Sequence, residues 1–323
     1  MPHFAAEWRK YMSKKRILII GSSNLDFVMN MYKLPEAGET ITDNGGVAYI
    51  PGGNGASAAI AFSRLGAESV FCSKLGADIH GQKLYNYYKE IGLNTSYIKV
   101  DHDTPTGLAV VMREGDGTTR SVVFPGANAQ LTTEVILEAF ECNPDALYLG
   151  FELPYPMVVA AAKVAASKQI PIFIDATAAS KELDLELLPP VEVFSPNEQE
   201  ALELTGILPT SMETSLRAAL AIARKAKAKN VVIKQGARGA FLYDGKRYNT
   251  FPAVRADKIV DTTSAGDAFT AAMTLEYLRN GGDIKEAIKY GNVAAALTIT
   301  RPGAGSSIPN EDEINGFLFG SGN

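Results

Sequence analysis

Short apolar runs alternate with amphipathic segments along most of this chain of 323 residues. The runs have the length of buried strands, and the segments between them place apolar residues at helical spacing. Predicted strands cover residues 16–21, 70–74, 146–149, 172–175, 191–194 and 231–234. Predicted helices cover residues 58–65, 81–91, 132–140, 156–168, 197–205, 215–225, 285–298 and 311–319. This alternation predicts an α/β fold with a doubly wound, mainly parallel sheet flanked by helices.

Two segments interrupt the alternation. Residues 27–50 have strand character but are broken by a Pro and Gly cluster at 35–38, and residues 104–125 hold two apolar runs around a Gly-Asp-Gly turn. The second pattern is typical of a hairpin. Neither segment contains a helix long enough to cross a sheet. We therefore expect one domain over residues 16–323, with a small separate β-sheet made of these two segments.

The composition argues against several classes of protein. The net charge is −5 and the basic residues are scattered, which disfavours nucleic-acid binding. A hydrophobic content of 46% is enough for a large core. Only three histidines and two cysteines are present, Cys72 and Cys142, without a Cys-x-x-Cys motif. This count gives little basis for a zinc site or for disulfides.

The start of the chain shows no targeting signal. Residues 1–16 are charged and lack the apolar core of a signal peptide. No later run reaches the roughly 18 apolar residues that a membrane-spanning helix needs. We expect residues 1–15 to form an N-terminal extension, with Met12 as an alternative start, and the protein to be cytoplasmic with no membrane partner.

The stretch from Asp261 to Ala272 carries the strongest chemical signal. Apolar residues at helical spacing begin at residue 268, so residues 263–266 are predicted to form the turn before a helix. The free N–H groups of such a turn can bind an anion. Asp267 at its mouth is a candidate general base. The alternative is that Asp267 only caps the helix.

The sequence from Asp261 to Asp267, followed by Phe269, resembles the Asp-Thr-x-x-Ala-Gly-Asp signature of the ribokinase-like sugar kinases, the PfkB family. The resemblance covers residues 16–319 and implies an ATP-dependent kinase whose small β-sheet is a lid over the sugar. It implies that Asp267 is the base and that the amides of Ala265, Gly266 and Asp267 stabilise the transferring phosphoryl group. The chain has no P-loop motif.

Other polar residues follow predicted strands, where open α/β sheets bind ligands. Asn24 and Asp26 come after the first strand, although Asn and Asp are also turn formers. A Gly-x-Gly-x-x-Ala pattern from Gly53 is not a dinucleotide fingerprint, because it does not lie on the first strand-to-helix turn. By resemblance, the sugar site comprises Asn24, Asp26, Gly52, Gly53, Asn54, Ser57 and Glu152. Asn54 and Ser57 depart from the family pattern, which has lysine and asparagine there.

The resemblance also implies an ATP site and two ions. The ATP-side residues are Asn197, Lys234, Gly236, Gly239, Ser264, Ala265, Gly266 and Asn292, with a threonine usual at Lys234. Glu200 would order Mg²⁺ through water, as that ion keeps several waters. A K⁺ ion would lie among Asp261, Thr263, Thr298, Arg301, Gly303 and Ser307. The loop 301–307 is otherwise a Gly/Pro connection before a helix. The sequence Gly126–Ala129 also matches the family or forms a simple turn.

We therefore expect a kinase that phosphorylates the primary hydroxyl of a pentose, with D-ribose as the first candidate. Fructose, 2-deoxyribose and nucleosides are alternative acceptors. A non-catalytic sugar-binding relative is the alternative from another class, and such a protein would be expected to lose Asp267. An exposed edge of the small sheet favours a homodimer that forms through this lid.

Overall fold

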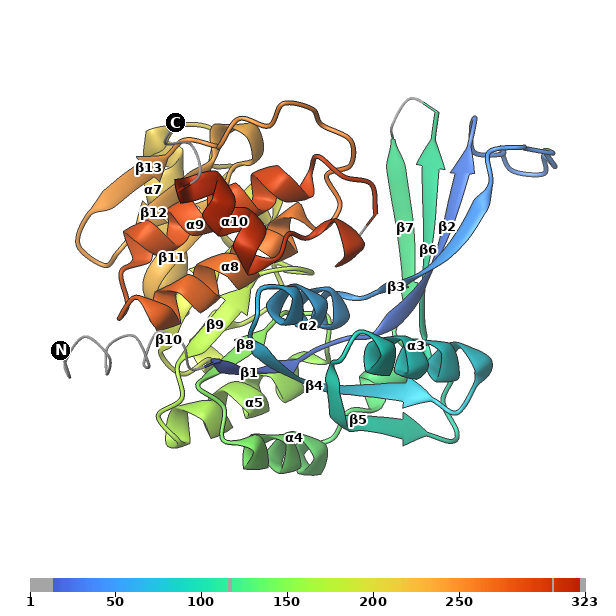
Figure 1. The fold of residues 1–323 in the computed structure, drawn as a ribbon, viewed down its shortest axis with the longest axis horizontal. Coiled ribbons are helices and arrows are strands. Elements are labelled where there is room, and N and C mark those ends of the chain that lie inside the picture. Colours follow the sequence, from blue (N-terminus) through green and yellow to red (C-terminus); the bar gives the residue numbers. More distant parts are fainter. Residues whose placement is uncertain (1–13, 116–117, 304, 320–323) are drawn as a thin grey trace.

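The computed structural model describes residues 14–115, 118–303 and 305–319, so most of the expected extension at 1–15 lies outside the described residues. Its main sheet has nine strands in the order β13-β12-β11-β10-β9-β8-β1-β4-β5 (Figure 1). All of its neighbouring pairs are parallel except β11–β12 and β12–β13. The strands are β1 (Arg16–Ile20), β4 (Glu68–Gly76), β5 (Asn94–Asp101), β8 (Ala146–Leu149), β9 (Ile172–Asp175), β10 (Val191–Ser195), β11 (Ala228–Lys234), β12 (Ala240–Tyr243) and β13 (Tyr248–Phe251).

Helices cover both faces of this sheet, because alternate residues of each buried strand point to opposite sides. Ile17 and Ile19 of β1 join one core, and Leu18 and Ile20 join the other. The first core is covered by α2 (Asn54–Arg64), α3 (Ile79–Glu90), α8 (Ala265–Arg279), α9 (Ile284–Thr298) and α10 (Glu311–Phe319). The second core is covered by α4 (Thr133–Ala139), α5 (Tyr155–Ser167), α6 (Glu198–Thr205) and α7 (Met212–Lys225). The predicted doubly wound α/β fold is confirmed.

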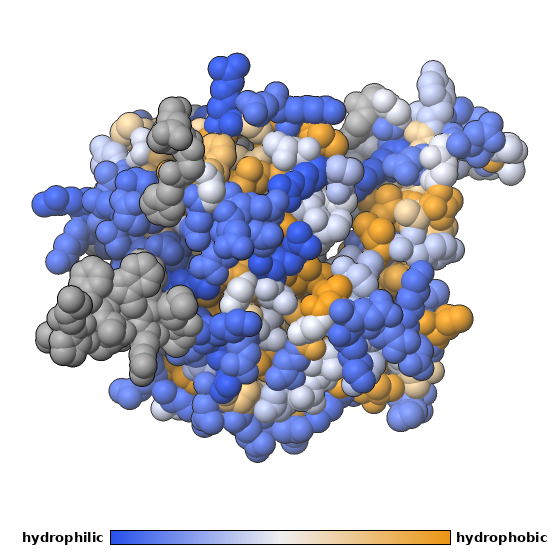
Figure 2. Space-filling model, in the orientation of Figure 1, coloured by the Kyte–Doolittle hydropathy of each residue, from blue (hydrophilic) through white to orange (hydrophobic). Residues whose placement is uncertain are grey.

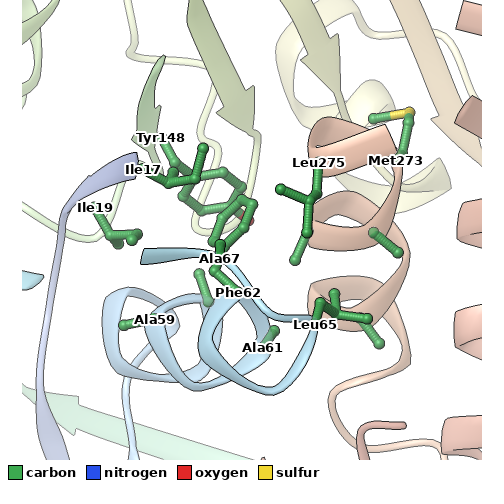
Figure 3. Packing of buried hydrophobic residues seen from close by; sticks show 14 of the residues in the cluster. Ile17, Ile19, Ala59, Ala61, Phe62, Leu65, Ala67, Tyr148, Met273 and Leu275 are labelled. Carbon is green, nitrogen blue, oxygen red and sulfur yellow. The ribbon is translucent and has the colours of Figure 1, made fainter. Parts of the chain in front are cut away.

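Aromatic and aliphatic side chains join α2 to α8 across the first core (Figure 3). Phe62 of α2 meets the ring of Tyr148 edge-on at a centroid distance of 5.3 Å. Leu275 of α8 lies beside them, and none of the three side chains is more than 3% exposed. Buried aromatic pairs of this kind fix the distance between elements, so α2 and α8 are held against the sheet.

The small sheet stands beside the main body in Figure 1 and has the strand order β3-β2-β6-β7. Its strands are β2 (Asn24–Met31), β3 (Val47–Gly52), β6 (Gly107–Glu114) and β7 (Thr119–Phe124). β2 runs parallel to β6, and the other two pairs are antiparallel. β2 begins before the expected range 27–50 and β3 ends after it, because the pairing of the two strands extends to Asn24 and Gly52. Residues 116 and 117 of the predicted turn lie outside the described residues.

Several boundaries differ from the sequence prediction. α2 begins at Asn54 rather than at residue 58, and α8 begins at Ala265, so Ala265 and Gly266 belong to the helix and not to the preceding turn. β5, β12 and β13 were not predicted. β5 and β13 mix polar and apolar residues without a clear period, whereas β12 is a four-residue apolar run. Short 3-10 helices within the described residues are η1 (Gly126–Gln130), η2 (Phe140–Cys142), η3 (Leu185–Leu187), η4 (Gly236–Arg238) and η5 (Gly305–Ser307).

The backbones of β1 and α2 approach each other closely just after the strand. A Cβ atom on Gly55 would lie 2.5 Å from the carbonyl carbon of Gly21. Gly55→Ala should therefore lower the free energy of unfolding by about 1–3 kcal/mol, as overpacking does, although alanine is normally the better helix residue. Urea unfolding followed by circular dichroism measures this change.

Gly316 of α10 provides the matched control, because a Cβ atom there would meet nothing within 4 Å. Gly316→Ala should be neutral or stabilising by about 0.5–1 kcal/mol. Equal effects of the two substitutions would contradict the close approach of β1 and α2.

Candidate active site

Two cavities meet at the start of α8. The larger, about 700 Å³, lies on the side of α6 and β11, and the smaller, about 370 Å³, lies between the main sheet and the small sheet. Asn54, Ser264 and Asp267 line both of them. A group bound in one cavity can therefore reach a group bound in the other beside the Asp267 carboxylate.

Asp267 lies in the first turn of α8, after Ser264, which has a φ of 59° in the left-handed region. Burial and the neighbouring carboxylate of Asp175 raise the pKa of Asp267 to about 7, although the Lys234 ammonium opposes this rise. A carboxylate with this pKa can accept a proton near neutral pH. The role of general base that the sequence analysis gave to Asp267 stays a prediction.

The first turn of α8 offers fewer free amides than the resemblance implied. The Ala265 N–H donates to the Thr262 carbonyl at 3.3 Å. Within the described residues, the N–H groups of Gly266 and Asp267 have no such backbone acceptor. These two N–H groups lie at the N-terminus of α8, where free amides and the helix dipole favour the binding of an anion.

Asn24 is held in place at the start of the smaller cavity. The Asn128 side-chain amide donates to Asn24 Oδ1 at 2.8 Å, and Asn128 Oδ1 accepts the Ser23 N–H at 2.8 Å. Asn24 and Asn128 are both buried. The motif Gly126–Ala129 is therefore a 3-10 helix whose asparagine orients Asn24, and not only a turn.

Two carboxylates lie deeper in the smaller cavity. Burial and the charge of Glu152 raise the pKa of Asp26 to about 7, and Asp26 Oδ1 has no hydrogen-bond partner among the described residues. Glu152 accepts the Asn54 N–H at 2.8 Å and the Ser22 hydroxyl. Gly52 must lack a side chain, since a Cβ atom there would lie 2.1 Å from the Asp26 carboxylate.

The remaining predicted sugar-side residues also face this cavity. Gly53 has a φ of 85° and precedes α2, so it supplies the turn that brings Asn54 to the cavity. The Asn54 amide Nδ2 is buried without a partner among the described residues. Ser57 lines the same cavity, one turn along α2. All of the sugar-site residues predicted from the sequence thus lie around one space.

The predicted ATP-side residues separate into two groups. Asn197, Glu200, Lys234 and Gly236 line the larger cavity. Asn197 and Glu200 form a capping box at the start of α6, with bonds of 2.6 and 2.8 Å. Burial raises the pKa of Glu200, and the Lys234 ammonium opposes this rise.

Gly239 and Asn292 lie outside the described lining of that cavity. A Cβ atom on Gly239 would lie 2.0 Å from the Phe251 carbonyl, and its φ is 90°, so this glycine serves the turn between β11 and β12. Asn292 on α9 donates to the Pro252 carbonyl at 3.2 Å. Its contact with adenine remains a prediction.

Asp175 is a residue of the larger cavity that the sequence analysis did not select. Lys234 Nζ lies 2.8 and 2.7 Å from its two carboxylate oxygens. Thr270 of α8 and Thr177 donate their hydroxyls to the same carboxylate, at 2.6 and 2.8 Å. The available signal was its position as the last residue of a buried strand, at the carboxyl edge of the sheet.

The segments 261–263 and 298–303 lie side by side. Asp261 accepts the N–H of Thr263 at 2.9 Å and that of Gly303 at 3.4 Å. The Thr298 hydroxyl donates to the Ala294 carbonyl, and Arg301 pairs with Glu313. The Thr298 hydroxyl oxygen keeps lone pairs for an ion, whereas the Thr298 carbonyl already accepts the Arg301 N–H at 3.3 Å. Arg301 can offer an ion only its main-chain carbonyl, because its guanidinium is a cation. Ser307 is buried in the same region.

The small sheet also contributes a charged residue that the sequence analysis missed. Arg113 of β6 lines the smaller cavity and donates to the Thr263 hydroxyl at 3.4 Å. Nothing in its local sequence separates Arg113 from an exposed strand residue. Its contact with Thr263 joins the small sheet to the turn before α8.

The sequence of this chain is similar to those of known carbohydrate kinases. The profile described as pfkB family carbohydrate kinase matches residues 14–311. A bifunctional ribokinase/ribose-5-phosphate isomerase A from Fructilactobacillus sanfranciscensis is 34% identical over 93% of this chain, which spans 55% of that protein. A ribokinase from Haemophilus influenzae is 32% identical, with 94% of this chain and 99% of the relative covered.

A solved structure of a ribokinase has a similar fold. Arabidopsis thaliana ribokinase complexed with ribose and ATP superposes with a TM-score of 0.82 at 27% identity, over 95% of this chain and 99% of that one. The profile match covers most of the chain, and the site has a buried carboxylate at a helix start between two cavities. This chain therefore belongs to the pfkB family of carbohydrate kinases and is an ATP-dependent sugar kinase.

Proposed function

We propose that this enzyme transfers the γ-phosphoryl group of ATP to the primary hydroxyl of a pentose, with D-ribose as the preferred acceptor. One observation carries the proposal: Asp267 lies where a polar cavity of about 370 Å³ meets a second cavity of about 700 Å³. The smaller cavity suits a sugar, since Asp26 and Asn54 carry buried polar atoms without partners there. Buried polar groups favour a ligand that pairs with them.

The proposed mechanism depends on position and charge. Asp267 accepts the proton of the sugar hydroxyl as the hydroxyl oxygen attacks the γ-phosphorus. The amides of Gly266 and Asp267 at the start of α8 donate to the phosphoryl oxygens, with Ser264 beside them. The Ala265 amide contributes only if its bond of 3.3 Å to Thr262 opens.

ATP is proposed to occupy the larger cavity, with its phosphates toward α8. Asn197, Lys234 and Gly236 line this cavity. Gly239 and Asn292 lie farther out, and we propose Asn292 for the adenine end.

Magnesium is proposed to accompany ATP. Among the described residues, no group of three or more His, Cys, Asp or Glu side chains is placed to hold a metal ion. Mg²⁺ typically needs only one or two carboxylates, with phosphates and water completing its shell. Glu200 fits this use, because it lines the cavity beside the proposed phosphates. The bound ion neutralises phosphate charge.

D-ribose is proposed because Asn24, Asp26 and Glu152 together offer donors and acceptors for several neighbouring hydroxyls. Relatives named ribokinase, and a similar structure that holds ribose and ATP, support this acceptor. Ser57 is the reason to keep 2-deoxyribose, fructose and nucleosides as alternatives. A serine reaches less far than the asparagine usual there.

We also propose that the small sheet closes over the sugar and that two copies associate through it. Phe27, Tyr49, Val110 and Val122 lie in register across its strands, on the face opposite Asp26. Figure 2 shows hydrophobic residues gathered over this sheet. Tyr49 and Val122 are 52% and 48% exposed, so a partner surface would cover apolar area. Light scattering tests this dimer by its mass.

The use of ATP and the free thiols of Cys72 and Cys142 support a cytoplasmic location. In the described part of the chain, every helix is too short or too polar to cross a lipid bilayer.

Replacing the base should remove most activity. Asp267→Asn should lower kcat by roughly 10²–10⁴-fold, the usual contribution of a general base. The affinity for the sugar should change far less, because Asn24, Asp26 and Glu152 remain. ADP release measures the rate, and a reaction with chelator in place of magnesium is the blank. Near wild-type turnover by the variant would refute the assignment, and turnover in chelator would refute the magnesium role.

A monovalent cation should increase the activity. We propose that Asp261 and the carbonyls of the loop 301–307 enclose K⁺, which orders the turn before α8. The rate should rise when sodium buffer is replaced by potassium buffer at equal ionic strength. Equal rates in potassium, sodium and a bulky organic cation would show that the loop is only a connection.

The acceptor is tested by comparing kcat/KM for ribose, 2-deoxyribose, fructose and adenosine. Ribose should be the best acceptor, because a buried group left unpaired by another sugar costs about 1–3 kcal/mol. Ser57→Asn should increase the preference for ribose over 2-deoxyribose. If ribose is not among the best substrates of either protein, the enzyme phosphorylates a different acceptor.

A further inference from the structure

Lys234 is a buried cation beside the reacting groups. Its side chain is 13% exposed and that of Asp175 is 3% exposed, with 2.7 Å between Nζ and Oδ2. The ammonium lies next to the first turn of α8, since a Cβ atom on Gly266 would be 3.9 Å from Nζ. It also lies 3.4 Å from the Thr270 hydroxyl. Lys234 is therefore fixed from two sides while it faces the larger cavity.

The cavity around it is acidic. Asp175, Glu198, Glu200 and Asp267 line it, and Lys234 is the only cation among its described lining residues. A triphosphate that entered this cavity would meet mainly negative side chains. Lys234 is the one described side chain there that can offer positive charge to a phosphoryl group.

A purely structural role explains the geometry less well. Replacing a buried ion pair by apolar residues of similar volume is often neutral or stabilising, so such pairs are weak determinants of stability. The pair lies at the carboxyl ends of β9 and β11, and not in either apolar core. Asp175 also accepts hydroxyl bonds from Thr177 and Thr270, which fix its orientation.

We propose that Lys234 binds the transferring phosphoryl group of ATP and keeps Asp267 ionised, and that Asp175 is the positioning residue that holds its ammonium at the start of α8. This inference rests on the proposed function, in which Asp267 is the base. As the phosphoryl group moves toward the sugar oxygen, the ammonium offsets the charge that builds on the phosphoryl oxygens. The covalent step itself is unchanged.

The ionisation of Asp267 provides a second measure of this arrangement. The groups that face Asp267 are Asp175 on β9, Lys234 on β11, Glu152 after β8 and Ser264 before α8. Asp175 raises the pKa of Asp267, and Lys234 lowers it. Removing the two charges one at a time should therefore shift the pH dependence of the reaction in opposite directions.

The experiment compares Lys234→Met, Asp175→Asn and the variant with both changes. Lys234→Met should lower kcat roughly 10²-fold, the scale of one lost donor to the developing charge, with little change in KM for the sugar. The acid limb of kcat/KM should move up by about 1 pH unit in Lys234→Met and down in Asp175→Asn. Lys229→Met is the matched control, because Lys229 is an exposed, paired lysine on the same strand.

Nucleotide binding gives a readout without turnover. Calorimetry with a non-hydrolysable ATP analogue and with ADP should show that Lys234→Met loses about tenfold in affinity for the analogue and less for ADP, since a lost charged contact of about 1.5 kcal/mol is roughly tenfold. The wild type and Asp267→Asn report separately on the proposed function. A wild type that transfers no phosphate to any sugar refutes that function, whatever the Lys234 variants do.

The double variant keeps the inference testable if a single variant does not fold, because it removes both members of the buried Lys234–Asp175 pair together. It should unfold near the wild-type temperature and still lose the rate and the selectivity for the ATP analogue. Wild-type kcat in the folded double variant would overturn the inference. An unmoved acid limb in both folded single variants would also overturn it.

Discussion

The close contact of β1 with α2 is the constraint on which both cavities depend. Gly21 and Gly55 meet backbone to backbone, and the Ala56 N–H donates to the Ser22 carbonyl at 3.0 Å. This contact brings the start of α2 over the carboxyl end of β1. The Asn54 N–H then donates to the Glu152 carboxylate at 2.8 Å. Glu152 follows β8, which neighbours β1 on the side away from β4. Residues from three distant parts of the sequence thus converge at one edge of the sheet.

The second constraint is electrostatic, because several carboxylates lie at the same edge of the main sheet. Asp26 and Asp267 both have pKa values of about 7, and burial is the main cause in each case. Their ionised forms are therefore less stable in the protein than in water. The fold tolerates this because the large apolar cores on both faces of the sheet supply stability elsewhere. Lys234 pairs directly with Asp175 at this edge, and Arg113 is a second described cation, in the lining of the smaller cavity.

Much of the fold followed from the sequence because its signals are local. Buried strands such as residues 146–149 and 172–175 read directly as apolar runs, and their ends were predicted without error. The strands β12 and β13 were missed, although β12 is a short apolar run, and β13 mixes polar and apolar residues. The start of α2 was placed four residues late, because Gly55 and Ser57 are weak helix formers.

The site was predicted less completely because its contacts join distant residues. Motifs placed Asn24, Asp26, Glu152 and Asp267 in one site, and these residues surround the smaller cavity. Asn128 holds Asn24 across 104 positions, and Asp175 holds Lys234 across 59. No pattern within either segment specifies those partners. Arg113 is a similar case, since only the pairing of β6 with β2 brings it to the cavity.

Two buried polar atoms in the lining of the smaller cavity distinguish this site from an ordinary protein core. A folded interior normally pairs its buried donors and acceptors, yet Asp26 Oδ1 and Asn54 Nδ2 have no partner among the described residues. An acceptor and a donor are thus left open in the smaller cavity. A sugar hydroxyl both donates and accepts, so one ligand with several hydroxyls can satisfy both atoms. Donation to Asp26 favours its ionised form, and it therefore offsets the burial that raised its pKa. Specificity then arises because an acceptor that lacks a matching hydroxyl leaves Asp26 Oδ1 or Asn54 Nδ2 unpaired.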